Sequence, residues 1–218
     1  MAPLLLLTSI QTGRVKVYPP AAPGELEWTS GIAKQAVAGP VWLGVEGLAG
    51  DEQSDHRHHG GLYQAVNVYP AEHYAFWNVQ PGMEAMAAGA FGENFTTQGM
   101  TEETVCIGDV YQVGEARVSI SNPRQPCYKL NRLWNVPALD ARAEELGLVG
   151  WYFKVDREGN VEAGQPFTLV DRLYPQWTIA RVYALRRRPD DQEALRALVE
   201  CPGLSPNWRE TLKRRLSG

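Results

Sequence analysis

Glycine and proline interrupt the first two thirds of this chain so often that short strands are the favoured elements there. The 218 residues include 21 glycines and 15 prolines. Turn signals recur at intervals of roughly 8–12 residues, the spacing of a closed or sandwiched sheet. Several intervening segments alternate polar and apolar side chains or are rich in β-branched residues. We expect strands over residues 4–10, 13–19, 32–39, 65–69, 93–99, 109–114, 116–122 and 165–172.

Two helices are expected within this strand-rich region. The first spans residues 70–79 and has Pro70 at its first helical position, where the missing N–H of proline costs nothing. The second spans residues 136–147 and ends at Gly147, a residue type that favours the left-handed turn after a helix.

The composition changes after Pro175. Helical periodicity continues to the end of the chain with breaks at Pro189 and at residues 201–203, which predicts three helices, the third with Ser205 as a candidate N-cap. The chain is therefore predicted to be mainly β with α. Residues 1–172 would form the β domain, and residues 173–218 a C-terminal helical extension.

Charge and apolar content exclude several classes of protein. The net charge of −4 argues against a protein that coats nucleic acid, because phosphate neutralisation needs a basic surface. No stretch approaches the ~20 apolar residues that span a bilayer. The first ten residues lack a basic region and are interpreted as a buried strand. Three cysteines without a C-x-x-C pair indicate a reducing compartment, so a cytoplasmic location is expected.

Cys127 stands out among the three cysteines. It lies in the sequence SNPRQPCYKLN, between an expected strand and a segment that could start a helix. Pro123 and Pro126 stiffen this loop, and Arg124 and Lys129 are cations that would favour a thiolate. A buried thiol without chemistry is the alternative reading, and it is the one we prefer for Cys106 and Cys201, which lie in apolar local patterns.

A second candidate site lies in the sequence GLAGDEQSDHRHHGG, residues 47–61. Its histidines invite a zinc interpretation, but no ligand set of the required number accompanies them, so His56 and His58 are predicted not to bind zinc. Glycine amides together with histidine and Arg57 could instead form an anion-binding nest. A third candidate is Asn94, in the sequence AFGENFTTQG, although its position before a strand could reflect turn chemistry alone.

Taken together, these stretches resemble the MOSC domain family (molybdenum cofactor sulfurase C-terminal domain), and more narrowly its stand-alone bacterial YiiM-type members. The likeness rests on GLAGDEQSDHRHHGG, AVNVYPAEHYAFW, the segment from FGENFTTQG to NPRQPCYKLN, and GLSPNWRETLKRRLSG, in that order. It runs from about Gly13 to the C-terminus. One departure is that Tyr63 stands where the family usually has an aspartate after H-G-G-x.

The resemblance implies a closed β-barrel of the MOSC type followed by three helices. It implies that Cys127 ligates molybdenum in a pterin-based molybdenum cofactor (molybdopterin), a role that suits a soft thiolate ligand. Its cofactor-binding candidates are Arg124, Lys129, His59, Gly60, Gly61 and Asn94. It further implies reduction of N-hydroxylated compounds such as 6-N-hydroxylaminopurine, with electrons from a separate flavoprotein. Monomer and homodimer both stay open.

Two other functions remain open from the sequence. Cys127 could hold a persulfide or hand on the cofactor as a carrier without turnover. It could also serve a thiol hydrolase or transferase in which His59 is the base.

Overall fold

The computed structural model describes residues 4–20, 24, 26–55 and 60–216. Its strands are β1 Leu6–Thr12, β2 Lys16–Tyr18, β3 Trp28–Ser30, β4 Gln35–Ala36, β5 Val41–Gly44, β6 Gly47–Leu48, β7 Val66–Pro70, β8 Phe95–Gln98, β9 Val110–Val113, β10 Ala116–Pro123, β11 Trp151–Arg157, β12 Gly159–Val161 and β13 Thr168–Asp171. Its α-helices are α1 Glu72–Trp77, α2 Lys129–Trp134, α3 Leu139–Leu146, α4 Ile179–Arg187, α5 Gln192–Val199 and α6 Pro206–Leu216, and a 3₁₀ turn η1 spans Leu62–Gln64. None of the helices in this described part has the length and apolar character needed to cross a membrane.

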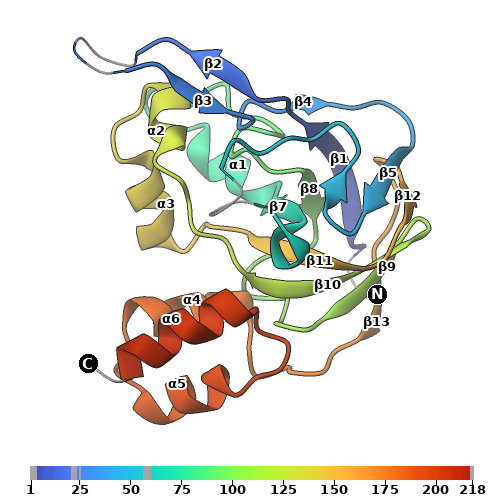
Figure 1. The fold of residues 1–218 in the computed structure, drawn as a ribbon, viewed down its shortest axis with the longest axis vertical. Coiled ribbons are helices and arrows are strands. Elements are labelled where there is room, and N and C mark those ends of the chain that lie inside the picture. The colour runs from blue at the N-terminus through green and yellow to red at the C-terminus, as the bar shows by residue number, and fades with distance from the viewer. Residues whose placement is uncertain (1–3, 21–23, 25, 56–59, 217–218) are drawn as a thin grey trace.

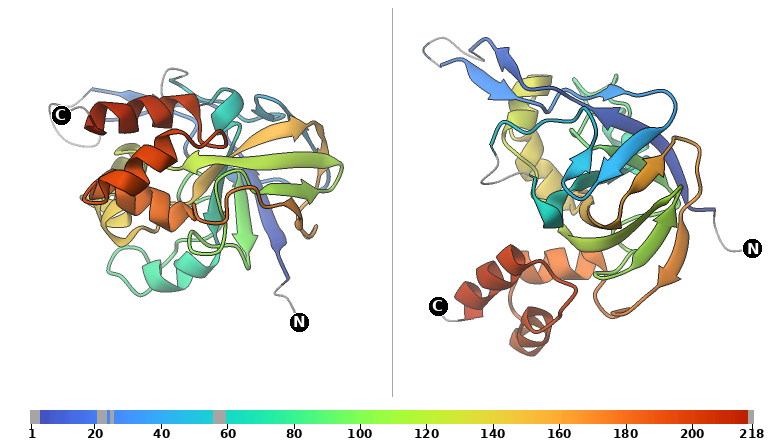
Figure 2. Two further views of the ribbon diagram at one scale, coloured as in Figure 1. Left: turned by 90° about the horizontal axis from the view of Figure 1, so that it is seen from below. Right: turned by 45° about the vertical axis from the view of Figure 1, so that its right-hand side comes forward.

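The main sheet has eight strands in the order β13-β9-β10-β11-β7-β8-β1-β4 and curls into a barrel (Figures 1 and 2). Neighbouring strands are antiparallel except β7 and β8. A short ladder joins β1 to the segment just before β13. The Leu7 amide donates to the Gln165 carbonyl at 3.0 Å, and the Phe167 amide donates to the Leu5 carbonyl at 2.8 Å. The predicted β-barrel is confirmed as a curled eight-stranded sheet, and this ladder brings its two sides together.

Two hydrophobic clusters lie on opposite sides of β7 because successive side chains of a strand point to opposite faces. Val66 and Val68 face the barrel interior and belong to the large cluster. Tyr69 belongs to a second cluster with Trp77 of α1 and Phe91. Asn67 lies on the same outward side as Tyr69, and this outer side of the sheet carries the site described below.

The last three helices pack under β10 (Figure 1). Their buried side chains, among them Val182, Leu195 and Leu212, join the same cluster as the barrel interior. The Ser205 amide donates to the Ser121 carbonyl at 3.0 Å and fixes the start of α6 against the sheet. Three C-terminal helices were predicted, and this is confirmed. The division at residues 172 and 173 stays a prediction, since the two parts share one core.

The structure corrects several sequence-based assignments. Pro70 ends β7, where it pairs with Thr97, instead of beginning a helix. The strand expected over residues 32–39 is reduced to the two residues of β4, which pair only with the end of β1. Strand β11 was not predicted, although it lies at the centre of the sheet between β10 and β7. Its apolar start, WYFKV, is typical of a strand buried on both faces and lacks the alternation we relied on.

Phe167 tests the importance of barrel closure. Its side chain is 4% exposed and contacts the rings of Phe95, Tyr111 and Phe153. We expect Phe167→Ala to lower the free energy of unfolding by about 3–5 kcal/mol, as measured by denaturant titration. Leu169→Ala is the control, because Leu169 lies two residues further on, in β13, and its side chain is 40% exposed. Equal losses for the two variants would contradict a packed closure at Phe167.

Candidate active site

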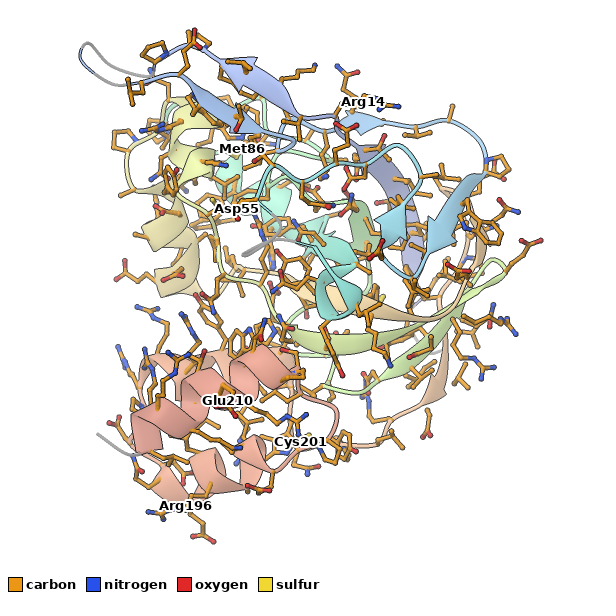
Figure 3. The ribbon with its side chains drawn as sticks, in the orientation of Figure 1. Arg14, Asp55, Met86, Arg196, Cys201 and Glu210 are labelled. Atoms are coloured by element: carbon orange, nitrogen blue, oxygen red, sulfur yellow. The ribbon has the colours of Figure 1, made fainter. Side chains whose placement is uncertain are left out.

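A pocket with a cavity volume of about 80 Å³ lies on the outer side of β7 and β11 and is partly open to solvent. One wall is the segment 51–54, directly before Asp55, which is labelled in Figure 3. Of the predicted site residues, the pocket lining includes Cys127, Arg124, Lys129, Asn94 and Gly60. Residues that are far apart in the sequence therefore meet at one place.

Cys127 lies on the irregular loop that the two prolines predicted. Strand β10 ends at Pro123, and the Arg124 amide then donates to the Gly150 carbonyl at 3.1 Å. The Cys127 carbonyl accepts from the Leu130 amide at 2.9 Å, at the start of α2. The loop is thus fastened at both ends. The Cys127 side chain is a free thiol, half-buried in the pocket wall.

Arg124 is a buried cation in the pocket lining with an unused hydrogen-bond donor. Its side chain is 3% exposed, and its Nη1 has no hydrogen-bond partner among the described residues. Burial raises the pKa of the neighbouring Tyr152 phenol, an effect that the Arg124 cation partly offsets. Tyr152 therefore stays neutral at ordinary pH and does not compensate the guanidinium charge. A buried cation with a spare donor favours an anionic ligand.

Lys129 and Asn94 line the pocket but use their polar groups within the protein. Lys129 Nζ donates to the Thr29 carbonyl at 2.9 Å and to Ser54 Oγ at 3.2 Å. Asn94 Nδ2 donates to Asp51 Oδ2 at 2.9 Å, and its Oδ1 accepts from the Asn67 amide at 3.1 Å. Both residues hold the pocket walls together, so any contact with a ligand would be additional to these bonds.

An ion pair that the sequence did not reveal completes the pocket. Lys34 Nζ contacts Asp51 Oδ1, and both side chains are almost fully buried. Burial lowers the pKa of Lys34, and Asp51 opposes this by stabilising the ammonium. Lys34 falls within a segment interpreted only as a strand, and Asp51 within the glycine-rich stretch. No local sequence pattern predicts this ion pair, because it forms between two loops that are separated in the sequence.

The glycine-rich stretch supplies the wall at residues 51–54, but of its predicted contact residues only Gly60 is among the described residues that line the pocket. Gly60 lines it, with φ 84°, whereas Gly61, with φ 78°, begins the turn η1 and borders a neighbouring hollow. His59 lies outside the described residues, as do Arg57 and the histidines His56 and His58. The prediction that the last two do not bind zinc therefore stays a prediction.

The other two cysteines lie away from the pocket. Cys201 sits among the C-terminal helices, at the other end of the molecule from Asp55 (Figure 3). Burial raises the pKa of the Cys201 thiol, and burial together with Asp109 raises that of Cys106. Both thiols stay protonated near neutral pH, which leaves Cys127 as the thiol with access to a ligand.

Comparison with known proteins agrees with this arrangement. The family model described as MOSC domain matches residues 55–168, and the model described as YiiM-like, 3-alpha helix domain matches residues 177–218. "Protein YiiM" of Escherichia coli (strain K12) is 38% identical over 96% of this chain and 92% of its own length. The crystal structure of YiiM from Geobacillus stearothermophilus superposes with a TM-score of 0.81 at 36% identity, covering 97% of this chain and 99% of that one.

A fungal relative carries a functional name. The protein "Reductase" of Gibberella moniliformis (strain M3125 / FGSC 7600) is 36% identical over 91% of this chain, which spans 35% of the longer fungal protein. The MOSC model covers most of the barrel, and the YiiM-like model covers the three C-terminal helices. The chain belongs to the MOSC family and, within it, to the YiiM-like proteins.

Thiol reactivity tests the placement of the three cysteines. We expect iodoacetamide at pH 8 to modify native protein at Cys127 and to leave Cys106 and Cys201 largely unmodified, because their raised pKa values and burial keep them as inaccessible thiols. Peptide mapping by mass spectrometry locates the adduct, and Cys127→Ser is the control. Preferential modification of Cys106 or Cys201 in folded protein would contradict the assignment.

Proposed function

We propose that this protein holds a molybdenum cofactor through Cys127 and reduces N-hydroxylated compounds such as 6-N-hydroxylaminopurine. The observation that carries the proposal is the buried, unpartnered Arg124 donor beside a half-buried cysteine in one pocket of a MOSC protein. The name of the fungal relative supports a reductive reaction.

The residues of the pocket fit a pterin-based cofactor with an anionic phosphate. Arg124 would meet the phosphate with its spare Nη1. Cys127 would supply the sulfur ligand, which suits a polarisable metal better than an oxygen ligand does. Lys129 adds positive potential from the pocket wall, whereas the charge of Lys34 is compensated by Asp51. His59, Gly60 and Gly61 stay candidates for contacts at the rim.

When bound, the cofactor would supply the two electrons that, with two protons, convert R–NH–OH to R–NH₂ and water. The protein's own residues fix where this happens. The fastened loop holds the Cys127 sulfur in place with little loss of entropy on binding, because Pro123 and Pro126 have already removed much of its freedom.

A cofactor or sulfur carrier is the second candidate function. It would use the same cysteine and the same phosphate contact without turnover. Reduction of substrate by the loaded protein with an artificial electron donor separates the two functions. A thiol hydrolase that uses Cys127 and His59 is a third candidate, and it would work without molybdenum.

Replacement of the cysteine tests the proposed function. We expect Cys127→Ser to fold normally but to retain no more than a few per cent of the molybdenum and of the 6-N-hydroxylaminopurine reduction, because an alkoxide is far more costly to form than a thiolate. Elemental analysis and turnover with dithionite are the measurements. Cys106→Ser and Cys201→Ser are the controls and should keep both. Active wild-type protein without molybdenum would contradict the proposal.

The C-terminal helices offer a surface for the electron-donating flavoprotein. Residues 177–218 carry nine basic and five acidic side chains, on a chain with a net charge of −4. Arg215 Nη1 donates to the Arg186 carbonyl, which brings together the basic ends of α4 and α6. Attraction between opposite charges speeds the encounter of two proteins, so an acidic flavoprotein fits this end of the molecule.

Charge reversal tests this surface. We expect Arg188→Glu with Arg214→Glu to slow turnover driven by an acidic flavoprotein reductase by roughly tenfold at low salt, and to leave dithionite-driven turnover unchanged. The control pair is Lys16→Glu with Arg117→Glu, which makes the same change of charge at exposed sites on β2 and β10, outside the C-terminal helices. Equal effects of the two pairs would contradict docking at the helices.

A further inference from the structure

Asn67 presents an unused acceptor to the pocket. It lies at the second position of β7, lines the pocket, and is 8% exposed. Its Oδ1 has no hydrogen-bond partner among the described residues. Neither sequence pattern nor family resemblance singled out this residue, because it lies within a stretch interpreted as an ordinary strand.

The direction of the Asn67 amide is fixed by its surroundings. Its Nδ2 donates to the Gly92 carbonyl at 3.0 Å. Turning the amide over would place two oxygens against each other, so the oxygen must point away from Gly92. The backbone is held as well, since the Asn67 amide donates to Asn94 Oδ1 at 3.1 Å and the Asn67 carbonyl accepts from the Asn94 amide at 2.7 Å.

A buried acceptor without a partner lowers the stability of a protein, and such groups are few in native structures. Asn67 Oδ1 and Arg124 Nη1 are two such atoms in the lining of one pocket. One is an acceptor and the other is a cationic donor. A ligand that satisfies both must offer an N–H or O–H group as well as an anionic or carbonyl oxygen.

We propose that Asn67 is a ligand-recognition residue whose Oδ1 accepts a hydrogen bond from an N–H or O–H group of a nitrogen heterocycle bound in the pocket. The inference rests on the proposed function, in which two ligands carry such groups. One is the pterin ring of the cofactor, and the other is the N-hydroxylated base. Arg124 Nη1 donates to an oxygen of the bound molecule, and Asn67 Oδ1 accepts from its N–H or O–H group.

Asn67→Leu tests the inference, because leucine has a similar size and lacks the acceptor. Asn122→Leu is the matched control: Asn122 is also buried and also has an unpartnered Oδ1, but it does not line the pocket. Two measurements need no turnover. They are the molybdenum and pterin content per protein at limiting cofactor supply, and the calorimetric Kd of 6-N-hydroxylaminopurine for loaded protein without reductant.

Loss of one buried hydrogen bond weakens binding by roughly tenfold. A several-fold fall in molybdenum and pterin content in Asn67→Leu places the donor on the cofactor. Normal content with a roughly tenfold higher Kd places it on the substrate. Either result supports the inference if Asn122→Leu stays within twofold of the wild-type protein.

Loading and Kd within twofold of wild type in folded Asn67→Leu overturn the inference and leave the proposed function standing. Wild-type protein without molybdenum overturns the proposed function and the inference with it. If Asn67→Leu does not fold, Asn67→Ala takes its place with the same expected losses, since it also lacks the acceptor.

Discussion

The buried carboxylate of Asp51 holds together the segments that form the pocket. Its oxygens accept from the Gly13 amide at 2.8 Å, from Lys34 Nζ, from Gln53 Nε2 at 3.1 Å and from Asn94 Nδ2 at 2.9 Å. These donors come from the turn after β1, the link between β3 and β4, the loop of Asp51 itself, and the approach to β8. These four donors satisfy the hydrogen-bonding capacity of the buried carboxylate, and its removal would leave the Lys34 charge uncompensated.

The Asp51 carboxylate is fully hydrogen-bonded, so the buried atoms of the same pocket that lack a hydrogen-bond partner stand out. Among the described residues that line the pocket, the buried side-chain atoms without a hydrogen-bond partner are Arg124 Nη1 and Asn67 Oδ1. Strand alternation explains why polar groups can gather here without disturbing the core. Val66 and Val68 fill the barrel, while Asn67 between them faces outward to the pocket. One face of β7 therefore packs in the core, and its other face lines the pocket.

Local patterns predicted much of this molecule. Prolines predicted the stiff loop of Cys127, and helical periodicity predicted the three C-terminal helices. Interactions between distant segments were not predictable in this way. The Lys34–Asp51 pair depends on how two loops meet, and β11 lacks alternation because both of its faces are buried. Asn67 could have been noticed as a single polar residue in the apolar run AVNVY, but its free oxygen depends on Gly92, 25 residues away.

Protection of Cys127 by the cofactor tests the central claim most directly. Wild-type protein, loaded with cofactor or stripped of it, is treated with iodoacetamide, and the adduct at each cysteine is quantified by peptide mapping alongside the molybdenum content. If the sulfur ligates the metal, Cys127 reacts in the stripped protein and resists alkylation in the loaded protein, whereas Cys106 and Cys201 stay unmodified in both. Equal alkylation of Cys127 in the two forms, with molybdenum retained throughout, would contradict the account.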